Sequence, residues 1–555
     1  MKIYASLFNF YFSLKSQASY LTLISSVEAL IKWISVVFKQ SFASSRTTNM
    51  ADILVGYFTI FLACLISILV TKLYKSSRVK SHLPPAPFRL PIIGHLHLLS
   101  PVLHQAFHKL STRHGPVFQL FLGSTPCVVV SSPEAAKEFL KTHEHAFLDR
   151  PHNSIVKYFA YGGEGFIFAH YGTYWKFMKK IIMSEVLNGK KLDLFSPVKY
   201  DEVNHFIAYL SQKAKDGKSV ELQGQLMKLT SNILSRVCMS KRFSDEEDES
   251  RIFIKIITKI NETIGKFNLS DHIWFCKNLD LQGLGKISKD MHYRYDALME
   301  RIIREHKVTR NQDVGGVKDL LNILFDISKD ESMEIKLTRE NIKAFIRELL
   351  GAGTDTSAIS IEWALAELIN HPNIMKKAVE EIDKFVGKNR LLQESDIPNL
   401  SYLQAIVKET LRLHPSASLI PRLSTQDSII CGYHIPANTT TFVNVWSLGR
   451  DPSHWESPHE FKPERFEGKQ LDVRGQHFNF LPFGTGRRMC PGISLALLTI
   501  HITLGSMIQC FEWKAGENGN LANVDMEEGI GFTVPRANHL VCVPVARLDP
   551  IPLHD

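Results

Sequence analysis

The chain has 555 residues, of which 45% are hydrophobic and 10% aromatic, enough apolar material to bury a large core. Its formal net charge of +9 is modest for this length, and no basic stripe with interleaved aromatic residues indicates nucleic-acid binding. Its eight cysteines include no Cys-x-x-Cys pair, which argues against a disulfide framework and a structural zinc site. No linker interrupts the chain after residue 91, so we expect one large domain.

The amino-terminal part is predicted to form a membrane anchor followed by a stiff spacer. Ile53–Val70 contains no charge and approaches the roughly 20 apolar residues with which a helix spans a bilayer. Basic residues follow it, which favours a cytosolic position for the rest of the chain. Prolines at 84, 85, 87 and 91 fix φ and lack an amide donor. We therefore predict an anchor at residues 50–71, a basic and proline-rich hinge at 72–91, and a catalytic domain at 92–555.

Residues 1–49 allow two interpretations. They are rich in serine, contain Glu28 as their one acid and carry five basic residues, a composition typical of an organelle transit peptide. Alternatively, the working protein begins at Met50, which leads directly into the anchor. We favour the second interpretation because a signal anchor stands at the start of a chain.

The body is predicted to be mainly helical, with its clearest helix beginning after Thr338. Thr338 suits an N-cap, Glu340 suits the first turn, and apolar residues recur at helical spacing from Ile342 onward. The pattern continues to Asn370, so this helix is expected to cross most of the domain. Short β-like runs at residues 127–131, 439–445 and 540–545 predict a smaller sheet region.

The stretch Phe483–Gly492, FGTGRRMCPG, holds the most informative cysteine. Glycines such as Gly486 permit tight turns and let the backbone approach a flat ligand. Cys490 precedes Pro491, which is predicted to stand near the N1 position of a helix. A helix N-terminus lowers the pKa of a thiol, and a metal ligand must be a thiolate. The alternative for such a loop is a buried free cysteine beside a glycine turn.

The same stretch matches F-x-x-G-x-R-x-C-x-G at every fixed position, and here the sequence resembles the cytochrome P450 haem-thiolate monooxygenases. The resemblance implies the cytochrome P450 fold, mainly α with a smaller β region, and haem b bound through the thiolate of Cys490. It also implies electrons from NADPH through a separate NADPH–cytochrome P450 reductase, since the chain has no G-x-G-x-x-G fingerprint of its own. The haem contacts that it implies are Trp175, Lys179, Arg422, Phe483, Gly486, Arg488 and Gly492.

One of these contacts departs from the family pattern. Trp175-Lys-Phe-Met-Lys179 stands where the family usually has W-x-x-x-R. A lysine keeps the charge of an arginine but lacks its bidentate fork, which weakens the expected contact of Lys179 with a haem propionate.

Two charged motifs support the resemblance. Glu409 and Arg412 lie three residues apart, on one face of a helix, and alone would indicate an ordinary ion pair. With Pro463-Glu-Arg-Phe466 they resemble the Glu–Arg–Arg triad of the family, which would consist of Glu409, Arg412 and Arg465. The role that the resemblance implies for this triad is structural.

The motif Ala352–Ser357, AGTDTS, lies inside the predicted long helix. Gly353 costs about 1 kcal/mol relative to alanine there, so we expect it to let a ligand pass close to the backbone. A threonine hydroxyl can bond the carbonyl four residues back and bend the helix. Without a functional role, the motif would be a polar surface patch. The family motif A-G-x-D-T-T/S implies that Thr356 hydrogen-bonds the bound dioxygen and that Asp355 relays protons from solvent.

Longer stretches narrow the resemblance to plant flavonoid enzymes, closest to the flavone synthase II and flavanone 2-hydroxylase group. They lie at residues 90–100, 174–181, 271–283 and 470–478. The implied reaction is oxidation of a flavanone at C2 to a flavone or a 2-hydroxyflavanone. The implied location is the endoplasmic reticulum membrane, or a plastid if residues 1–49 act as a transit peptide.

Other functions remain open at this point. Within the family, an isoflavonoid or pterocarpan hydroxylase and an isoflavone synthase are the alternatives, because residues 154–170 and 415–425 differ most from the relatives. Outside monooxygenation, a reductase-independent haem-thiolate isomerase or dehydratase and a non-enzymatic haem-binding protein are the alternatives. Asp355 and Thr356 argue against the isomerase, which would not need a proton relay.

Overall fold

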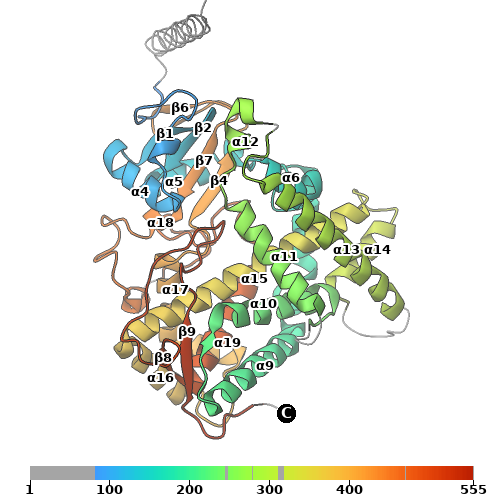
Figure 1. The fold of residues 1–555 in the computed structure, drawn as a ribbon, viewed down its shortest axis with the longest axis vertical. Coiled ribbons are helices and arrows are strands. Elements are labelled where there is room, and N and C mark those ends of the chain that lie inside the picture. Colours follow the sequence, from blue (N-terminus) through green and yellow to red (C-terminus); the bar gives the residue numbers. More distant parts are fainter. Residues whose placement is uncertain (1–81, 244–247, 278, 311–317, 469, 554–555) are drawn as a thin grey trace, which may run out of the picture. The chain divides into compact units, whose positions relative to one another are not determined.

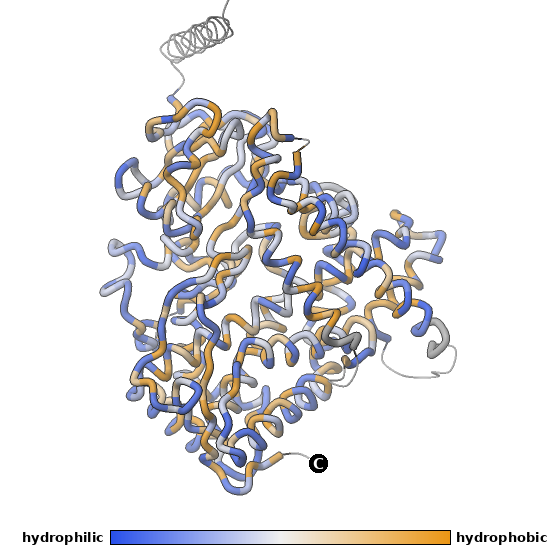
Figure 2. Tube along the Cα trace, viewed as in Figure 1, coloured by the Kyte–Doolittle hydropathy of each residue, from blue (hydrophilic) through white to orange (hydrophobic). Residues whose placement is uncertain are grey.

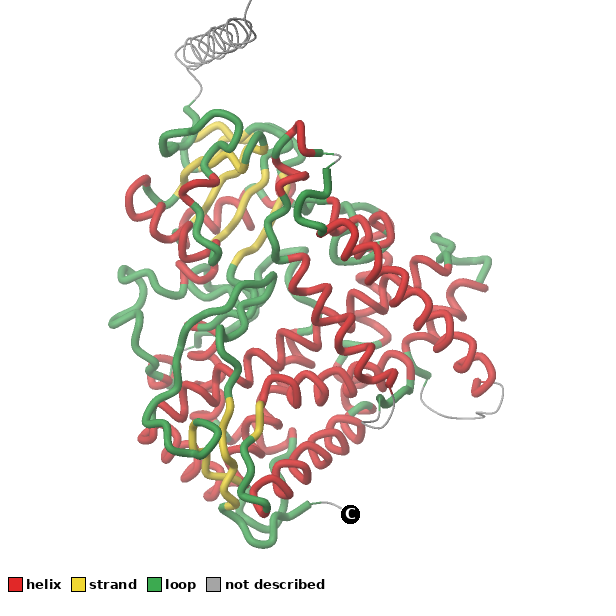
Figure 3. Tube along the Cα trace, in the orientation of Figure 1, coloured by secondary structure: helices red, strands yellow, loops and turns green. Residues whose placement is uncertain are grey.

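The computed structural model describes residues 82–243, 248–277, 279–310, 318–468 and 470–553 (Figure 1). The predicted extension at residues 1–49, the anchor Ile53–Val70 and the basic part of the hinge lie outside these residues. The fold is that of a mainly helical protein with a smaller sheet region, as predicted (Figure 3).

Helices with one buried face make up most of the described chain, and the hydropathy of the tube alternates along them (Figure 2). The α-helices are α4 (Leu103–His114), α5 (Pro133–Lys137), α6 (Ser154–Phe159), α7 (Thr173–Glu185), α8 (Gly189–Leu194), α9 (Ser196–Lys215), α10 (Leu222–Met239), α11 (Asp248–Ile264), α12 (Leu269–His272), α13 (Leu284–Arg310), α14 (Leu320–Lys329), α15 (Arg339–Asn370), α16 (Pro372–Phe385), α17 (Ser401–Leu413), α18 (Val445–Leu448) and α19 (Ile493–Cys510).

The strands form three sheets. In the largest, the order is β1-β2-β7-β4, with β2 parallel to β7 and the other neighbours antiparallel. A second sheet has the order β3-β9-β8, and β5 pairs with β6. The three predicted β-like runs correspond to β2, β7 and β9. The strands are β1 (Val117–Leu122), β2 (Thr125–Val130), β3 (Val220–Glu221), β4 (Leu419–Leu423), β5 (Ser428–Ile430), β6 (Tyr433–Ile435), β7 (Thr440–Asn444), β8 (Phe511–Ala515) and β9 (Val541–Ala546).

Helix α15 begins and ends where the sequence predicts. The side chain of its N-cap Thr338 accepts a hydrogen bond from Asn341 N, and the Asn341 side chain accepts one from Thr338 N, which forms a capping box. Most of α15 is buried, and α10 packs along it, with Thr230 Oγ1 donating to Thr354 O at 2.8 Å. The long helix is therefore the central wall of the domain (Figure 1).

Gly353 serves this helix packing and not the approach of a ligand, which corrects the expectation from sequence. A Cβ atom at Gly353 would lie 2.7 Å from Leu234 Cδ1 on α10. A side chain there would force the two helices apart or push Leu234 aside. The glycine thus allows α10 to lie close to the oxygen-activation motif.

Helix α19 starts later than predicted. Its N-cap is Gly492, so Pro491 precedes the cap and does not occupy N1. Among the described residues α19 is the one helix long and apolar enough to cross a membrane, but 78% of that segment is buried in the protein. Its apolar character therefore reflects a position in the core.

The described part of the predicted hinge is attached to the domain. Gln119 N on β1 donates to Pro85 O at 2.8 Å, and His434 N on β6 donates to His82 O at 2.7 Å. His95 Nε2 lies 3.0 Å from Pro87 O. Residues 82–91 therefore run along the sheets as an extended segment and belong to the same structural unit as the residues that follow.

Candidate functional site

Cys490 lies in a tight loop directly before α19. Its backbone N–H donates to Phe483 O at 3.0 Å, which closes the loop, and Gly486 adopts a φ of 70° that favours glycine. The Gly492 N–H donates to the Cys490 sulfur. Burial raises the pKa of the Cys490 thiol, while this hydrogen bond and the nearby cations act to lower it. The sulfur is therefore placed where an additional positive charge, such as a metal ion, would favour the thiolate.

On the side where a Cβ atom would lie, Gly486 makes room for a side chain of the protein. A Cβ atom at this position would lie 2.3 Å from Glu144 Oε1. That carboxylate accepts from Arg487 N at 2.6 Å and from Arg487 Nη1 at 3.0 Å. Gly486 thus allows Glu144 to hold the cysteine loop from outside.

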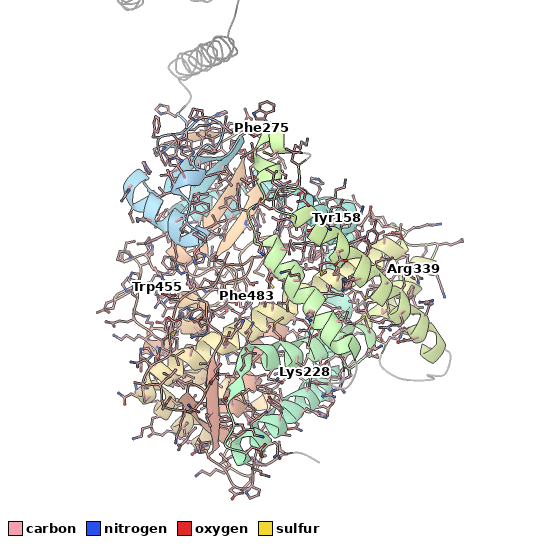
Figure 4. All side chains as sticks on the ribbon, in the orientation of Figure 1. Tyr158, Lys228, Phe275, Arg339, Trp455 and Phe483 are labelled. Carbon is pink, nitrogen blue, oxygen red and sulfur yellow. The ribbon has the colours of Figure 1, made fainter. Side chains whose placement is uncertain are left out.

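Accessible surface remains inside the domain both on α15 and at the cysteine loop. Ala352 is exposed in the middle of α15, although most of that helix is buried. Cys490 and Arg150 are surrounded by protein and yet retain accessible area. Phe483, which begins the loop, is labelled in Figure 4 beside α15. From these accessible residues we infer an open space between α15 and the cysteine loop, in which a bulky planar group could meet the Cys490 sulfur.

Three arginines gather near this space without matching carboxylates. Arg422 is 3% exposed, and its Nη1 donates to the adjacent carbonyl oxygen, Pro421 O. Arg488 donates to Leu148 O at 2.8 Å and to Ala169 O at 2.6 Å, but its Nη1 has no partner among the described residues. Arg150 Nε likewise has none. The cluster Arg150/Arg422/Arg488 therefore contains uncompensated positive charge.

The lowered pKa values of Arg422 and Arg488 show that the cluster lacks compensating negative charge. Burial lowers the pKa of Arg422 well below its usual range, and repulsion from Arg150 and Arg488 lowers it further. Burial, followed by repulsion from Arg150, lowers the pKa of Arg488 to about 9. Asp149 lies 3.9 Å from Arg488 but already accepts hydrogen bonds from His170 and Tyr171. A ligand with two carboxylates, such as the propionates of haem, fits this set of donors.

Trp175 and Lys179 reach the same region from α7. The Trp175 ring lies 4.6 Å from the Arg488 guanidinium, which it covers. Lys179 Nζ donates to Arg487 O and Met489 O, each at 3.3 Å. The lysine that replaces the usual arginine therefore holds the cysteine loop through its carbonyl oxygens.

Asp355 and Thr356 point in different directions from α15. Thr356 Oγ1 donates to Ala352 O at 2.8 Å and remains accessible, as a mid-helix threonine was expected to do. Asp355 is 8% exposed and accepts a short hydrogen bond from Thr533 in the carboxyl-terminal segment. Burial raises the pKa of Asp355, opposed by hydrogen bonds from Thr533 and Asn261. Sequence reasoning missed these two partners because they come from distant segments and belong to no motif.

Glu409, Arg412 and Arg465 form a closed buried cluster. Arg412 donates twice to the Glu409 carboxylate, at 2.7 Å each, and Arg465 Nε donates to it at 3.1 Å. The remaining guanidinium N–H groups donate to backbone carbonyls of residues 449–460. The Trp455 ring, labelled in Figure 4, lies 5.1 Å from the Arg412 guanidinium. The hydrogen bonds of the Glu409–Arg412–Arg465 cluster join α17 to the segment around Pro463–Phe466.

Comparison with known proteins identifies this combination of fold and site. The family model described as cytochrome P450 matches residues 84–543. The 3,9-dihydroxypterocarpan 6A-monooxygenase of Glycine max is 52% identical, over 89% of this chain and 99% of that protein. Beta-amyrin 24-hydroxylase of Glycine max is 43% identical, over 89% and 98%. A zebra fish cytochrome P450 structure with progesterone superposes with a TM-score of 0.69 at 26% identity and covers 80% of this chain and 100% of that one.

Proposed function

The chain belongs to the cytochrome P450 family and is a monooxygenase, and from that premise we propose that it oxidises a flavonoid. The observation that carries the proposal is its 52% identity to a pterocarpan monooxygenase over 99% of that protein. The beta-amyrin hydroxylase, which is named for a triterpene, is less similar at 43%. The stretches that resemble flavonoid enzymes in the sequence support the same substrate class.

Members of this family use haem-thiolate iron and take electrons from NADPH through a reductase, and the bound haem activates dioxygen. We assign the iron ligand to Cys490. The two propionates would be held by the cluster Arg150/Arg422/Arg488, and Trp175 would cover Arg488 beside them. Arg150 was not predicted from the sequence.

Proton delivery is assigned to Thr356 and Asp355. The accessible Thr356 hydroxyl lies on the open side of α15, next to exposed Ala352, where it can donate to a ligand after leaving Ala352 O. Asp355, with its raised pKa, holds a proton more readily than an exposed aspartate and exchanges it through Thr533. We expect Thr356→Ala to keep substrate binding but to divert NADPH consumption to hydrogen peroxide. Comparison of NADPH oxidised with product formed checks this, and a fully coupled variant would remove Thr356 from the pathway.

Two reactions are candidates within the flavonoid class. Oxidation of a flavanone at C2, to a flavone or a 2-hydroxyflavanone, is the reaction that the sequence motifs favour. Hydroxylation of a pterocarpan is the second candidate, and the identity to the 6A-monooxygenase favours it.

We further propose that the protein works at the endoplasmic reticulum membrane with a membrane-bound reductase as partner. Large apolar side chains are exposed around α12 and the amino-terminal segment: Trp274 is 75% exposed, Phe88 78% and Ile92 56%. Phe275, labelled in Figure 4, adjoins Trp274. These segments are neighbours through the β1–β2 turn, because Ser124 N donates to His272 O and Gly123 N donates to Ile93 O. Such a surface suits contact with lipid and agrees with the predicted anchor Ile53–Val70.

Membranes that carry the protein and a plant reductase provide the test. They are incubated with NADPH and, separately, with naringenin, 3,9-dihydroxypterocarpan and β-amyrin, and the products are identified by mass. We expect an NADPH-dependent product from one or both flavonoids and none from β-amyrin. Oxidation of β-amyrin alone would overturn the flavonoid assignment, and the choice between naringenin and the pterocarpan decides between the two candidate reactions.

A further inference from the structure

A serine connects the loop between α17 and β4 to the oxygen-activation motif on α15 (Figure 1). Ser416 Oγ donates to Thr356 O at 3.0 Å, and Ser360 Oγ, one helical turn after Thr356, donates to the same carbonyl at 2.9 Å. The two hydroxyl oxygens lie 2.9 Å apart. Both serines are buried, at 8% and 3% exposed. The Thr356 carbonyl is therefore held both from within its own helix and from a neighbouring loop.

Two successive hydroxyl groups bond the carbonyls one turn back in this part of α15. Thr356 Oγ1 donates to Ala352 O at 2.8 Å, and Ser360 Oγ donates to Thr356 O at 2.9 Å. Such bonds bend a helix and tilt its carbonyls outward, so a donor from a neighbouring segment can set the direction of a carbonyl. Ser416 supplies such a donor to the Thr356 carbonyl.

The backbone of Ser416 is itself held by the segment that contacts Asp355. Val534 N donates to Ser416 O at 3.0 Å, and Val534 O accepts from Trp363 Nε1 on α15 at 2.9 Å. The residue before it, Thr533, donates to the Asp355 carboxylate. The Ser416 loop and the hydrogen-bond partner of Asp355 are therefore parts of one connected network.

A stacked pair of rings fixes the start of the same loop. The His414 imidazole lies parallel to the Trp363 indole, with ring centroids 4.1 Å apart and 4° between the planes. His414 Nε2 also lies 2.7 Å from Glu367 Oε1 on α15. Both rings are buried. The loop that begins at Pro415 therefore starts from a residue that is fixed on α15, which makes the position of Ser416 well defined.

We propose that Ser416 is a positioning residue for proton delivery by Thr356. The Ser416 hydrogen bond fixes the peptide group that follows Thr356, and with it the direction in which the Thr356 side chain leaves the helix. A hydroxyl directed in this way can leave Ala352 O and donate on the open side of α15. Without the Ser416 hydroxyl, the carbonyl keeps Ser360 as a donor but is no longer tied to the loop. The Thr356 hydroxyl would then deliver protons less efficiently, although it is still present.

This inference rests on the proposed function, because it assumes that Thr356 delivers protons, but it does not depend on the substrate class. The competing explanation is a solely structural tie, in which Ser416 holds the loop to α15 without affecting proton delivery. The two explanations differ in the fate of the electrons. Two electrons from NADPH and two protons reduce one dioxygen to hydrogen peroxide when delivery fails. When delivery succeeds, the same electrons and protons yield water and the oxidised substrate.

The experiment measures how NADPH is divided between product and hydrogen peroxide. Membranes that carry the protein and a plant reductase receive whichever of naringenin, 3,9-dihydroxypterocarpan and β-amyrin the wild type oxidises. We expect Ser416→Ala to raise the ratio of peroxide to product by about three- to tenfold, the effect of one lost hydrogen bond. Substrate binding and haem content should stay those of wild type. Ser416→Thr keeps a hydroxyl and should keep most of the coupling.

Two other serines provide matched controls. Ser418→Ala removes a buried hydroxyl from the same loop, but that hydroxyl lies 2.9 Å from His104 Nδ1 on α4, so the peroxide ratio should not change. Ser360→Ala removes a donor to the same carbonyl but leaves the loop tied through Ser416, so it should raise the ratio less than Ser416→Ala does. Equal ratios in Ser360→Ala and Ser416→Ala would contradict the role of the tie. Haem content, from the carbon monoxide difference spectrum, shows which variants are folded.

A measurement without turnover tests the tie itself. Deuterium uptake by the α15 segment around Thr356, followed by mass spectrometry, should be about three- to tenfold faster in Ser416→Ala, because the helix opens more often after losing this hydrogen bond. Ser418→Ala should exchange as wild type does. Unchanged uptake in Ser416→Ala would show that the loop does not hold the helix and would overturn the inference. Faster uptake with an unchanged peroxide ratio would leave only the structural tie and would also overturn the positioning role.

The double variant distinguishes this inference from the proposed function. If Ser416 acts through Thr356, Ser416→Ala should add nothing to the peroxide ratio of Thr356→Ala. Effects that multiply in the double variant would show that Ser416 acts by another route, which contradicts the inference. If Thr356→Ala uncouples the reaction but Ser416→Ala does not, the inference alone fails. If Thr356→Ala stays fully coupled, the assignment of proton delivery fails and the positioning role of Ser416 fails with it.

Discussion

Two clusters of buried arginines lie in this domain, and they differ in whether the chain itself supplies their acceptors. Around Glu409, every guanidinium N–H group of Arg412 has a carboxylate or carbonyl acceptor. In the cluster Arg150/Arg422/Arg488, donor atoms remain without partners, and the arginines lower one another's pKa. A closed cluster stabilises the chain by itself, whereas an open one is completed only by a ligand. The contrast supports the proposed haem site independently of the sequence motifs.

The largest effect should come from the thiol of Cys490, the residue assigned to the iron. We expect Cys490→Ala to lose the haem-thiolate band of the reduced carbon monoxide complex completely, together with all monooxygenase activity. The absorption spectrum of purified membranes measures this. Retention of the band would show that another residue binds the iron.

The stability of the protein should depend strongly on the acid of the closed cluster, Glu409. Glu409→Ala leaves two buried arginines unpaired and should lower the free energy of unfolding by about 3–5 kcal/mol. Urea unfolding, followed by circular dichroism, measures this loss. As a surface control, Lys376→Ala removes one partner of the exposed ion pair with Glu380. It should change the free energy of unfolding by less than about 1 kcal/mol. A stable Glu409→Ala protein would contradict the structural role of the cluster.

A buried carboxylate differs from both arginine clusters, because it loses its charge by binding a proton. An arginine side chain stays charged and needs an acceptor. Burial raises the pKa of Glu362 from 4.5 to about 7, so the folded protein binds more protons than the unfolded chain in this range. The stability that this group contributes is complete below pH 4.5 and is lost as the pH rises through 7, at about 1.4 kcal/mol per unit. Glu362→Gln should remove roughly 3 kcal/mol of this decline. Urea midpoints between pH 4.5 and 8 measure it, and parallel profiles for variant and wild type would contradict it.

The smallest change in stability should come from a substitution in the open cluster Arg150/Arg422/Arg488. The sign of that change distinguishes the open cluster from the closed one. Arg422→Met removes an uncompensated buried charge, so the haem-free protein should keep or gain stability. The same change removes a propionate donor worth about 1.5–3 kcal/mol, so haem should transfer to apomyoglobin at least about tenfold faster. Glu409→Ala should have the opposite effect on stability, because it destabilises the haem-free protein. If Arg422→Met and Glu409→Ala changed the stability of the haem-free protein and the rate of haem transfer equally, the distinction between the two clusters would be wrong.

Local sequence signals predicted the elements that position the site. Thr338 and the apolar spacing after it gave both ends of α15, since caps and periodicity act within one segment. The fixed spacing around Cys490 located the cysteine loop. The start of α19 was predicted too early, because the loop hydrogen bonds of Cys490 and the Gly492 cap displace Pro491 from the helix.

The remaining parts of the site depend on contacts between distant segments. Arg150 enters the open cluster because Asp149 bridges to Leu423, the last residue of β4, and no periodicity in the sequence marks that approach. Thr533 reaches Asp355 across 178 positions of the chain. Gly353 and Gly486 were assigned to ligand contact because a glycine shows only that space is needed. The structure shows that Leu234 and Glu144 occupy that space.

If the open arginine cluster binds haem as proposed, the amount of this enzyme in a cell should respond to haem supply. Haem binds only the folded chain, so it stabilises that chain by mass action, by about 2.7 kcal/mol when free haem exceeds its dissociation constant a hundredfold. When haem is scarce, the repulsion among Arg150, Arg422 and Arg488 persists and more chains open to proteolysis. The abundance of the protein would then be set after translation, by the same charges that we propose to hold its cofactor.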